Sequence, residues 1–126
     1  MSKKIVATKS APTALGPYSQ AVVHKGVVYC SGQIAIDPEK NKIVDGGISE
    51  QVEQVMKNLK SVLEAAESDM KRVLKCTIYL ADMSDFAVVN GIYEKFFDSE
   101  PPARETVAVK ALPKNVLVEI SCVAYQ

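Results

Sequence analysis

The chain is poor in histidine and cysteine, and it lacks the spacings by which metal sites and redox pairs are recognised. It has one histidine, His24, and three cysteines, Cys30, Cys76 and Cys122. The cysteines form no CxxC pair and are odd in number, so we expect no disulfide framework and a reducing compartment, the cytoplasm. No cluster of histidine, cysteine or carboxylate residues has metal-ligand spacing, so we expect no metal.

Signatures of nucleotide and membrane binding are missing as well. The sequence contains no GxGxxG motif and no P-loop, so a nucleotide cofactor has no support. The first ten residues, MSKKIVATKS, have no apolar core of the kind found in secretory signals. No apolar run is long enough to span a bilayer. We therefore expect no membrane partner, and chemistry that needs neither a metal nor a cofactor.

Neither sign of charge is in excess. Lysine plus arginine number 15, aspartate plus glutamate number 15, and the formal net charge is zero. Nucleic-acid binders usually carry a basic excess on one face, so a nucleic-acid partner is not expected, although a local basic cleft is compatible with this balance. A length of 126 residues, with 48% apolar and 24% charged residues, predicts one globular domain over residues 1–126.

Apolar periodicity predicts an α+β fold. Residues 48–66 and 84–97 have apolar side chains at steps of three and four, which is typical of amphipathic helices. Pro101 and Pro102 prevent the second helix from continuing. Two such helices among strands predict a layered fold with both helices on one face of a sheet. The predicted strands are 19–23, 27–31, 42–44, 73–80, 104–110 and 116–125.

The last predicted strand indicates an interface. Its even-numbered residues are apolar and should pack beneath the helices, because side chains alternate between the faces of a strand. The odd-numbered face is half apolar, which indicates burial against another subunit. Glu119 would then lie near that interface. This face carries Leu117, Val123 and Tyr125, and Tyr79 and Ala108 are candidates to join it.

Two charged residues are candidates for chemistry. Arg104 follows two prolines that stiffen the backbone, and its planar guanidinium suits bidentate carboxylate binding. The alternative is a surface arginine at a strand end. Glu119 is a polar residue in an apolar strand. Desolvation would raise its pKa and suit it to hold or activate a water, whereas the alternative is a solvated residue or an ion pair.

Three further positions have both a functional and a purely structural interpretation. Phe86, Asn90, Tyr93 and Phe97 align at steps of four, three and four. A buried Asn90 needs partners, so it either braces a site or lies at the helix edge. Ser31-Gly32-Gln33 ends a strand and is typical of a turn. The lone His24 beside a predicted turn is interpreted as a surface residue.

Five segments resemble one known family in order and spacing. The chain resembles the RidA (reactive intermediate deaminase A, YjgF-type) family over essentially its whole length. Each segment alone is a weak signal, but their order and spacing together are highly specific. The segments are GPYSQA at 16–21, SGQI at 31–34, DMSDFAVVNGIYEKFF at 82–97, PPARETV at 101–107 and LPKNVLVEISCVA at 112–124.

The resemblance implies a fold similar to that of the bacterial chorismate mutase type, with a mixed sheet and two helices on one face. It also implies a homotrimer whose sheets join into a central barrel, with a ligand cleft at each subunit interface. The implied activity is hydrolysis of 2-iminopropanoate and 2-iminobutanoate, intermediates released by pyridoxal-phosphate enzymes, to 2-keto acids and ammonia. Other activities attributed to family members are endoribonuclease, translation inhibitor and chaperone-like functions. A further alternative is a non-catalytic module in which the same arginine holds 2-keto acids or other small carboxylates.

The resemblance also implies roles for individual residues. Arg104 would bind the substrate carboxylate, and Glu119 would position or deprotonate the attacking water. Tyr18 would pack against the substrate from a neighbouring subunit, Ser31 would donate to or accept from the ligand, and Asn90 would brace the arginine.

Three more positions complete the implied site. Gln33 would support the cleft from the same motif as Ser31. Thr106 stands at a substrate-binding position where many members have cysteine, although imine hydrolysis needs only a backbone carbonyl or a water there. Glu105 is expected to point to the opposite strand face from Arg104.

Overall fold

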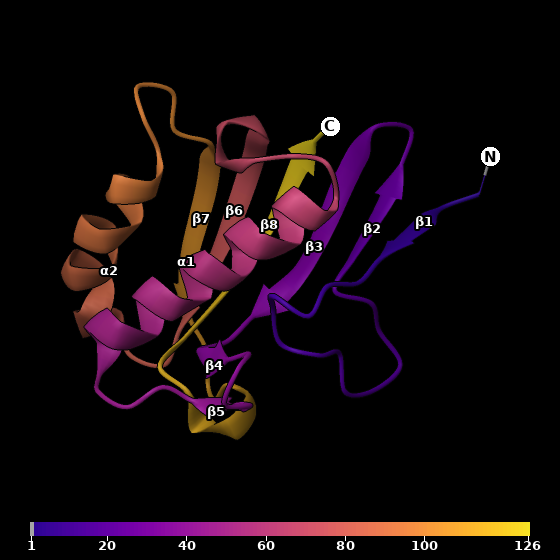
Figure 1. The fold of residues 1–126 in the computed structure, drawn as a ribbon. Helices are drawn as coiled ribbons and strands as arrows, with labels where there is room; N and C mark the ends of the chain where they lie inside the picture. Colours follow the sequence, from indigo (N-terminus) through magenta and orange to yellow (C-terminus); the bar gives the residue numbers. More distant parts are fainter. Residues whose placement is uncertain (1) are drawn as a thin grey trace.

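The computed structural model describes residues 2–126, whose strands form one six-stranded sheet and a small two-stranded sheet (Figure 1). The large sheet has the order β1–β2–β3–β8–β6–β7. Its β6–β7 pair is parallel and its other pairs are antiparallel, so the sheet is mixed. The strands of this sheet are β1 Lys4–Val6, β2 Ala21–His24, β3 Val27–Gln33, β6 Val73–Leu80, β7 Ala103–Ala108 and β8 Val118–Tyr125. The small sheet pairs β4 Ile36–Asp37 with β5 Lys42–Ile43.

Two α-helices, α1 Ile48–Ala65 and α2 Phe86–Tyr93, lie on the same face of the large sheet (Figure 1). The predicted α+β class and the placement of both helices on one sheet face are therefore confirmed. The second predicted helix is shorter than expected, because 3₁₀ turns replace its two ends. Among residues 2–126, none of the helices combines the length and the apolar character that a membrane span requires. The 3₁₀ turns are η1 Met70–Arg72, η2 Met83–Asp85, η3 Glu94–Phe96 and η4 Pro113–Asn115.

The hydrophobic core lies between the helices and the sheet. Its largest fully buried side chains come from α1 and from two neighbouring inner strands, β6 and β8. Burying one such side chain stabilises the fold by roughly 1.5–3 kcal/mol. The alternation predicted for the last strand is confirmed, because its even-numbered residues from 116 to 124 are all buried. The largest core side chains include Met56, Leu59, Leu63, Ile78, Leu80 and Ile120.

The other face of the sheet is open to solvent in the single chain and is partly apolar. Tyr29 pairs across the strands with Val123, and Tyr29 and Tyr125 are 52% and 44% exposed. The expectation that Ala108 belongs to this face was wrong. Ala108 pairs with Leu80, a fully buried core residue, so register places it on the helix side.

Buried amides on α1 fix the loops that flank the open face. The Asn58 Nδ2 donates to the carbonyl oxygens of Ile34 and Ile36, at 3.1 and 3.0 Å. The Oε1 of Gln51 accepts from the Leu117 N–H at 2.9 Å. One helix therefore holds both the segment after β3 and the residue before β8, which adjoin the predicted site residues Gln33 and Glu119.

We predict that Asn58→Ala destabilises the fold by roughly 1–3 kcal/mol, because it removes two partly buried hydrogen bonds to the carbonyl oxygens of Ile34 and Ile36. Denaturant unfolding would measure the loss. Lys57→Ala is the matched control, since Lys57 is the preceding residue of α1 and is exposed. Equal unfolding free energies for the two variants would show that Asn58 does not anchor the segment.

Candidate functional site

A hollow of about 490 Å³ lies between the N-terminal loop, the end of β3 and the start of β8. Four of the residues predicted from sequence line it: Tyr18, Ser31, Gln33 and Glu119. They come from three separate segments of the chain. The fold therefore gathers the GPYSQA, SGQI and LPKNVLVEISCVA segments into one place, here called the Glu119 hollow.

The end of β3 is shaped to admit the Glu119 carboxylate. Pairing between β3 and β8 shifts between Cys30 and Gln33, which is the signature of a β-bulge. Gly32 lies in this bulge, and a Cβ atom added there would overlap the Glu119 carboxylate. The backbone can approach the carboxylate this closely only because residue 32 has no side chain.

The loop that carries Tyr18 is tied to the sheet by two side chains. The buried Gln20 Nε2 donates to the carbonyl oxygens of Thr8, Ala11 and Pro12, and its Oε1 accepts from the Thr8 N–H. The Ser31 hydroxyl donates to the Ser19 carbonyl oxygen at 2.6 Å. The proton of Ser31 is thus engaged with backbone, and its oxygen retains lone pairs that can accept from a ligand.

Sequence reasoning gave Gln20 no role. The available signal was a glutamine at the entry to a strand, directly after a loop rich in proline and glycine. The structure shows what it does: one buried amide satisfies four backbone groups of that loop.

Glu119 is a partly buried carboxylate in this hollow. Desolvation by burial raises its pKa above the usual glutamate value. The ion pairs found among residues 2–126 join Arg72 to Asp69 and Lys75 to Glu105, and they do not include Glu119. A carboxylate with raised proton affinity is suited to take a proton from water and to return it.

A second hollow, of about 790 Å³, lies between α2, the segment that follows it and the start of β7. Arg104 and Asn90 line it, and we call it the Arg104 hollow. The Arg104 Nη1 donates to the Asn90 Oδ1 at 2.7 Å. Asn90 is half-buried, and it makes the contact with Arg104 that the bracing interpretation requires.

The two residues after Arg104 point in opposite directions. Thr106 pairs with the core residue Ile78, and its hydroxyl oxygen is covered and has no partner among the described residues. In the single chain this hydroxyl therefore faces neither hollow. Glu105 pairs with Lys75 at 3.0 Å and accepts from Thr77 at 3.3 Å, so it points away from Arg104 as expected. Lys75 holds the pKa of Glu105 below its usual value.

Arg104 and Glu119 stand on opposite faces of the sheet. Arg104 is in register with Cys76, which is buried on the helix side. Glu119 is in register with Tyr79 on the open side. Residues directly opposite one another on neighbouring strands share a face. The two hollows also have no lining residue in common. One chain therefore does not bring its two principal candidate residues together.

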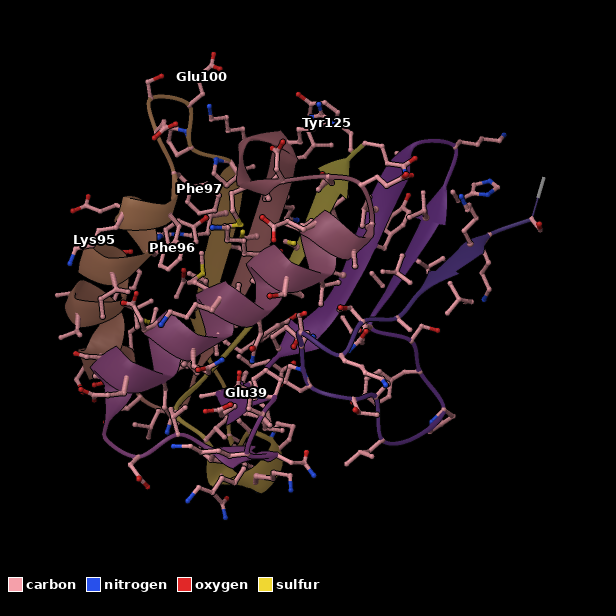
Figure 2. All side chains as sticks on the ribbon, in the orientation of Figure 1. Glu39, Lys95, Phe96, Phe97, Glu100 and Tyr125 are labelled. Carbon is pink, nitrogen blue, oxygen red and sulfur yellow. The ribbon has the colours of Figure 1, made fainter. Side chains whose placement is uncertain are left out.

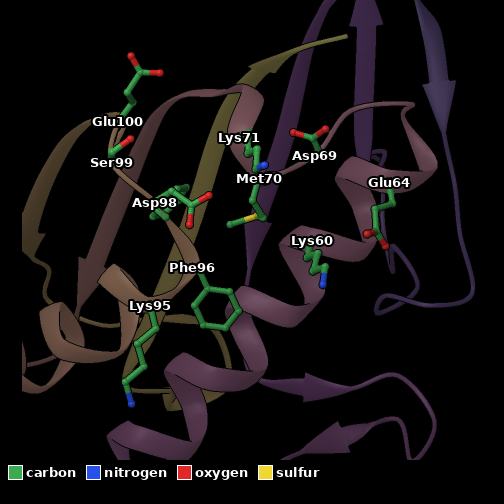
Figure 3. Close-up of a pocket in the computed structure, with 11 residues that line it drawn as sticks. Lys60, Glu64, Asp69, Met70, Lys71, Lys95, Phe96, Asp98, Ser99 and Glu100 are labelled. Atoms are coloured by element: carbon green, nitrogen blue, oxygen red, sulfur yellow. The ribbon is translucent and has the colours of Figure 1, made fainter.

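The remaining candidates lie elsewhere. His24 ends β2 and lines neither hollow. A third hollow, of about 640 Å³, lies between α1 and residues 94–100 (Figure 3), and none of the predicted site residues lines it. Its rim mixes cations such as Lys60 with carboxylates such as Glu64, so its charge favours no one class of ligand. Within residues 2–126, no three histidine, cysteine or carboxylate side chains are grouped in a way that could hold a metal ion.

Comparison with known proteins identifies the family. The profile of the family described as Endoribonuclease L-PSP matches residues 8–126. The chain belongs to this RidA (YjgF-type) family. A human relative named 2-iminobutanoate/2-iminopropanoate deaminase is 45% identical over 124 residues, which span 98% of this chain and 90% of the relative.

Solved structures of RidA-family proteins share the fold. A RidA from the Antarctic bacterium Psychrobacter sp. PAMC 21119 is 41% identical, with a TM-score of 0.94 and coverage of 98% of this chain and 99% of that one. A structure of Escherichia coli TdcF with bound serine is 36% identical, with a TM-score of 0.93 and coverage of 98% of both chains.

We predict that Glu119→Gln raises the thermal stability of this RidA-family protein at about pH 7 and that the gain disappears near pH 4. The pKa of Glu119 is higher in the folded chain than in the unfolded chain. At pH values between these two pKa values, the folded state therefore binds more protons than the unfolded state. Wild-type stability therefore falls as pH rises through that window, while glutamine does not titrate.

Thermal unfolding at both pH values measures this difference. Glu39→Gln is the control, because Glu39 is exposed on the β4–β5 turn (Figure 2). A gain for Glu119→Gln that is equally large at both pH values would contradict the assignment.

Proposed function

We propose that this protein is an imine deaminase that hydrolyses 2-iminopropanoate and 2-iminobutanoate to 2-keto acids and ammonia. The observation that carries the proposal is the exposed Arg104 guanidinium held by Asn90 through Nη1 alone. That is the one side-chain hydrogen bond of Arg104 among the described residues, so its other N–H groups remain to bind a planar carboxylate. The deaminase name of the human relative supports the same substrate class.

The proposed site needs more than one chain. Because Arg104 and Glu119 lie on opposite faces of the sheet, a substrate of a few atoms cannot contact both in one subunit. We propose a homotrimer in which the Arg104 hollow of one subunit closes against the Glu119 hollow of its neighbour. The partly apolar open face supports this, since its exposed Tyr29, Val107 and Tyr125 would be buried between the sheets.

The chemistry follows from these positions. Arg104 binds the carboxylate of the substrate as a bidentate pair, and Asn90 holds the guanidinium. Tyr18 of the neighbouring subunit packs against the substrate. An imine carbon is already electrophilic, so correct placement of the water contributes much of the rate.

Glu119 carries the proton. It takes a proton from the water as the water oxygen bonds to the imine carbon, and the π electron pair moves to nitrogen. Glu119 then gives that proton to the amine nitrogen of the tetrahedral intermediate. That first proton makes the nitrogen an amino group. Glu119 then takes the proton of the hydroxyl group and passes it to this nitrogen as the C–N bond breaks, so ammonia leaves and the hydroxyl oxygen becomes the carbonyl oxygen of the 2-keto acid. Ser31 and Gln33 support this end of the site, and the backbone carbonyl of Thr106 is proposed to accept from the water.

We also propose that the protein works in a reducing compartment, the cytoplasm. Cys30, Cys76 and Cys122 are all free and buried. They lie in register on neighbouring strands, yet they remain thiols. Free thiols on neighbouring strands are typical of proteins kept under reducing conditions.

The Arg104–Asn90 contact also favours one alternative, a module that holds 2-keto acids without catalysis. Such a module needs the guanidinium but not a carboxylate beside the ligand. Glu119, with its raised pKa, is the feature that favours hydrolysis over binding alone.

We predict that Arg104→Ala lowers imine hydrolysis by about 100-fold or more, because two charge-assisted hydrogen bonds of roughly 1.5–3 kcal/mol each are lost. An amino-acid oxidase would generate the imine, and semicarbazide would trap what the protein leaves unhydrolysed. Arg72→Ala is the matched control, since Arg72 is the only other arginine and pairs with Asp69 away from both hollows.

The deaminase proposal would fail if the wild-type protein did not reduce the amount of imine that semicarbazide traps. Wild-type binding of 2-oxobutanoate under those conditions would then favour the binding module.

A further inference from the structure

Arg104 lies against three side chains that share one face of α2. Phe86, Asn90 and Tyr93 recur at steps of four and three residues, which places them in line on a helix. The Arg104 Cζ lies over the Phe86 ring at 5.6 Å from its centroid and over the Tyr93 ring at 5.1 Å. Both distances are within the range of a cation–π interaction. The guanidinium is thus flanked by two rings in addition to its hydrogen bond to Asn90.

The hydroxyl group of Tyr93 does not explain why a tyrosine stands here. Tyr93 is 5% exposed, and its hydroxyl oxygen is buried with no hydrogen-bond partner among the described residues. Burial raises the pKa of this hydroxyl above its usual value, and the neighbouring Cys76 thiol, a weak hydrogen-bonding group, raises it further. A buried hydroxyl without a partner costs stability. What Tyr93 offers its surroundings is the ring, which contacts Arg104 on one side and lies 4.8 Å from the Phe97 ring on the other.

One hydrogen bond is not enough to fix a guanidinium. Arg104 lies on the edge strand β7 and is exposed, so rotation about the single Nη1–Oδ1 bond would move its remaining N–H groups. Contacts with two rings restrict that rotation. A guanidinium already held in its binding orientation loses less conformational entropy when a carboxylate binds. Its affinity for the carboxylate is therefore higher.

We propose that the Tyr93 ring, together with that of Phe86, positions Arg104 for carboxylate binding. Tyr93 is therefore a positioning residue that acts through Arg104 and does not touch the reacting atoms. This inference rests on the proposed function, because the carboxylate is that of the 2-imino acid substrate. It explains why the site uses arginine, since a lysine ammonium has neither the planar fork nor the face that stacks on a ring.

The test measures the dissociation constant of 2-oxobutanoate, the product acid, by calorimetry on the intact protein. Tyr93→Phe keeps the ring and is expected to bind within about twofold of wild type. Tyr93→Leu and Phe86→Leu remove a ring and are expected to bind about tenfold more weakly, the ratio that corresponds to about 1.4 kcal/mol. The turnover number at saturating imine should change far less than the dissociation constant, because Glu119 and the water are untouched.

Two controls separate positioning from folding. Phe96→Leu makes the same chemical change on the segment that follows α2, at a ring that lines the third hollow (Figures 2 and 3), and should leave binding unchanged. Phe86 is 37% exposed, so Phe86→Leu tests the idea even if Tyr93→Leu unfolds. In an Arg104→Ala background, Tyr93→Leu should cause no further loss of binding.

Three results would overturn the inference. First, Tyr93→Leu and Phe86→Leu could bind 2-oxobutanoate as tightly as Phe96→Leu does. Second, Tyr93→Phe could bind it as weakly as Tyr93→Leu. Third, Tyr93→Leu could weaken 2-oxobutanoate binding further in the Arg104→Ala background. In each case wild type still binds and hydrolyses, so the proposed function stands. A wild type that neither binds 2-oxobutanoate nor hydrolyses imine contradicts the proposed function itself, and this inference with it.

Discussion

Side chains alternate between the two faces of a strand, and this constraint decides what one copy of the chain can do. On β7 it sends Arg104 to the helix side, where α2 supplies Asn90 and two rings. On β8 it sends Glu119 to the open side, where Gly32 and the Tyr18 loop surround it. Within one chain, each half of the proposed site therefore has its supporting residues in place, and the sheet separates the two halves.

The supports of the two halves differ in kind. On the Glu119 side, buried amides fix backbone: Gln20 holds the N-terminal loop, while Asn58 and Gln51 hold the segments next to β3 and β8. On the Arg104 side, the support acts on the guanidinium directly. A carboxylate that handles a proton gains from burial, which raises its pKa, whereas an arginine that binds a ligand needs N–H groups that the ligand can reach. The separation of the halves allows both environments.

The long elements could be predicted from sequence because their periodicity is sustained. The first helix and the strand 73–80 match the structure to within one residue. The strands β1 and β4 were missed because three and two residues are too few to show alternation. The helix predicted at 84–97 was too long because its apolar side chains continue into η3, where the backbone tightens and still packs on the core.

The site was predictable only in part, because some of its residues carry a local signal in the sequence and others depend on distant partners. The prolines before Arg104 and the isolated polar Glu119 are local signals, and the family resemblance added Tyr18, Ser31, Gln33 and Thr106. The supports were not visible, because they join residues distant in the chain: Asn58 with the carbonyls of Ile34 and Ile36, and Tyr93 with Arg104. A glutamine, an asparagine or a tyrosine with such a partner looks the same in sequence as one without it.

The most direct test of the account is complementation between subunits. Arg104→Ala and Glu119→Gln proteins would be unfolded together, refolded as an equal mixture and assayed for imine hydrolysis. If each site takes its arginine from one subunit and its glutamate from another, random mixing restores about one quarter of the wild-type sites, far more activity than the roughly one hundredth or less expected of Arg104→Ala alone. A mixture that stays as inactive as its components would contradict a site shared between subunits.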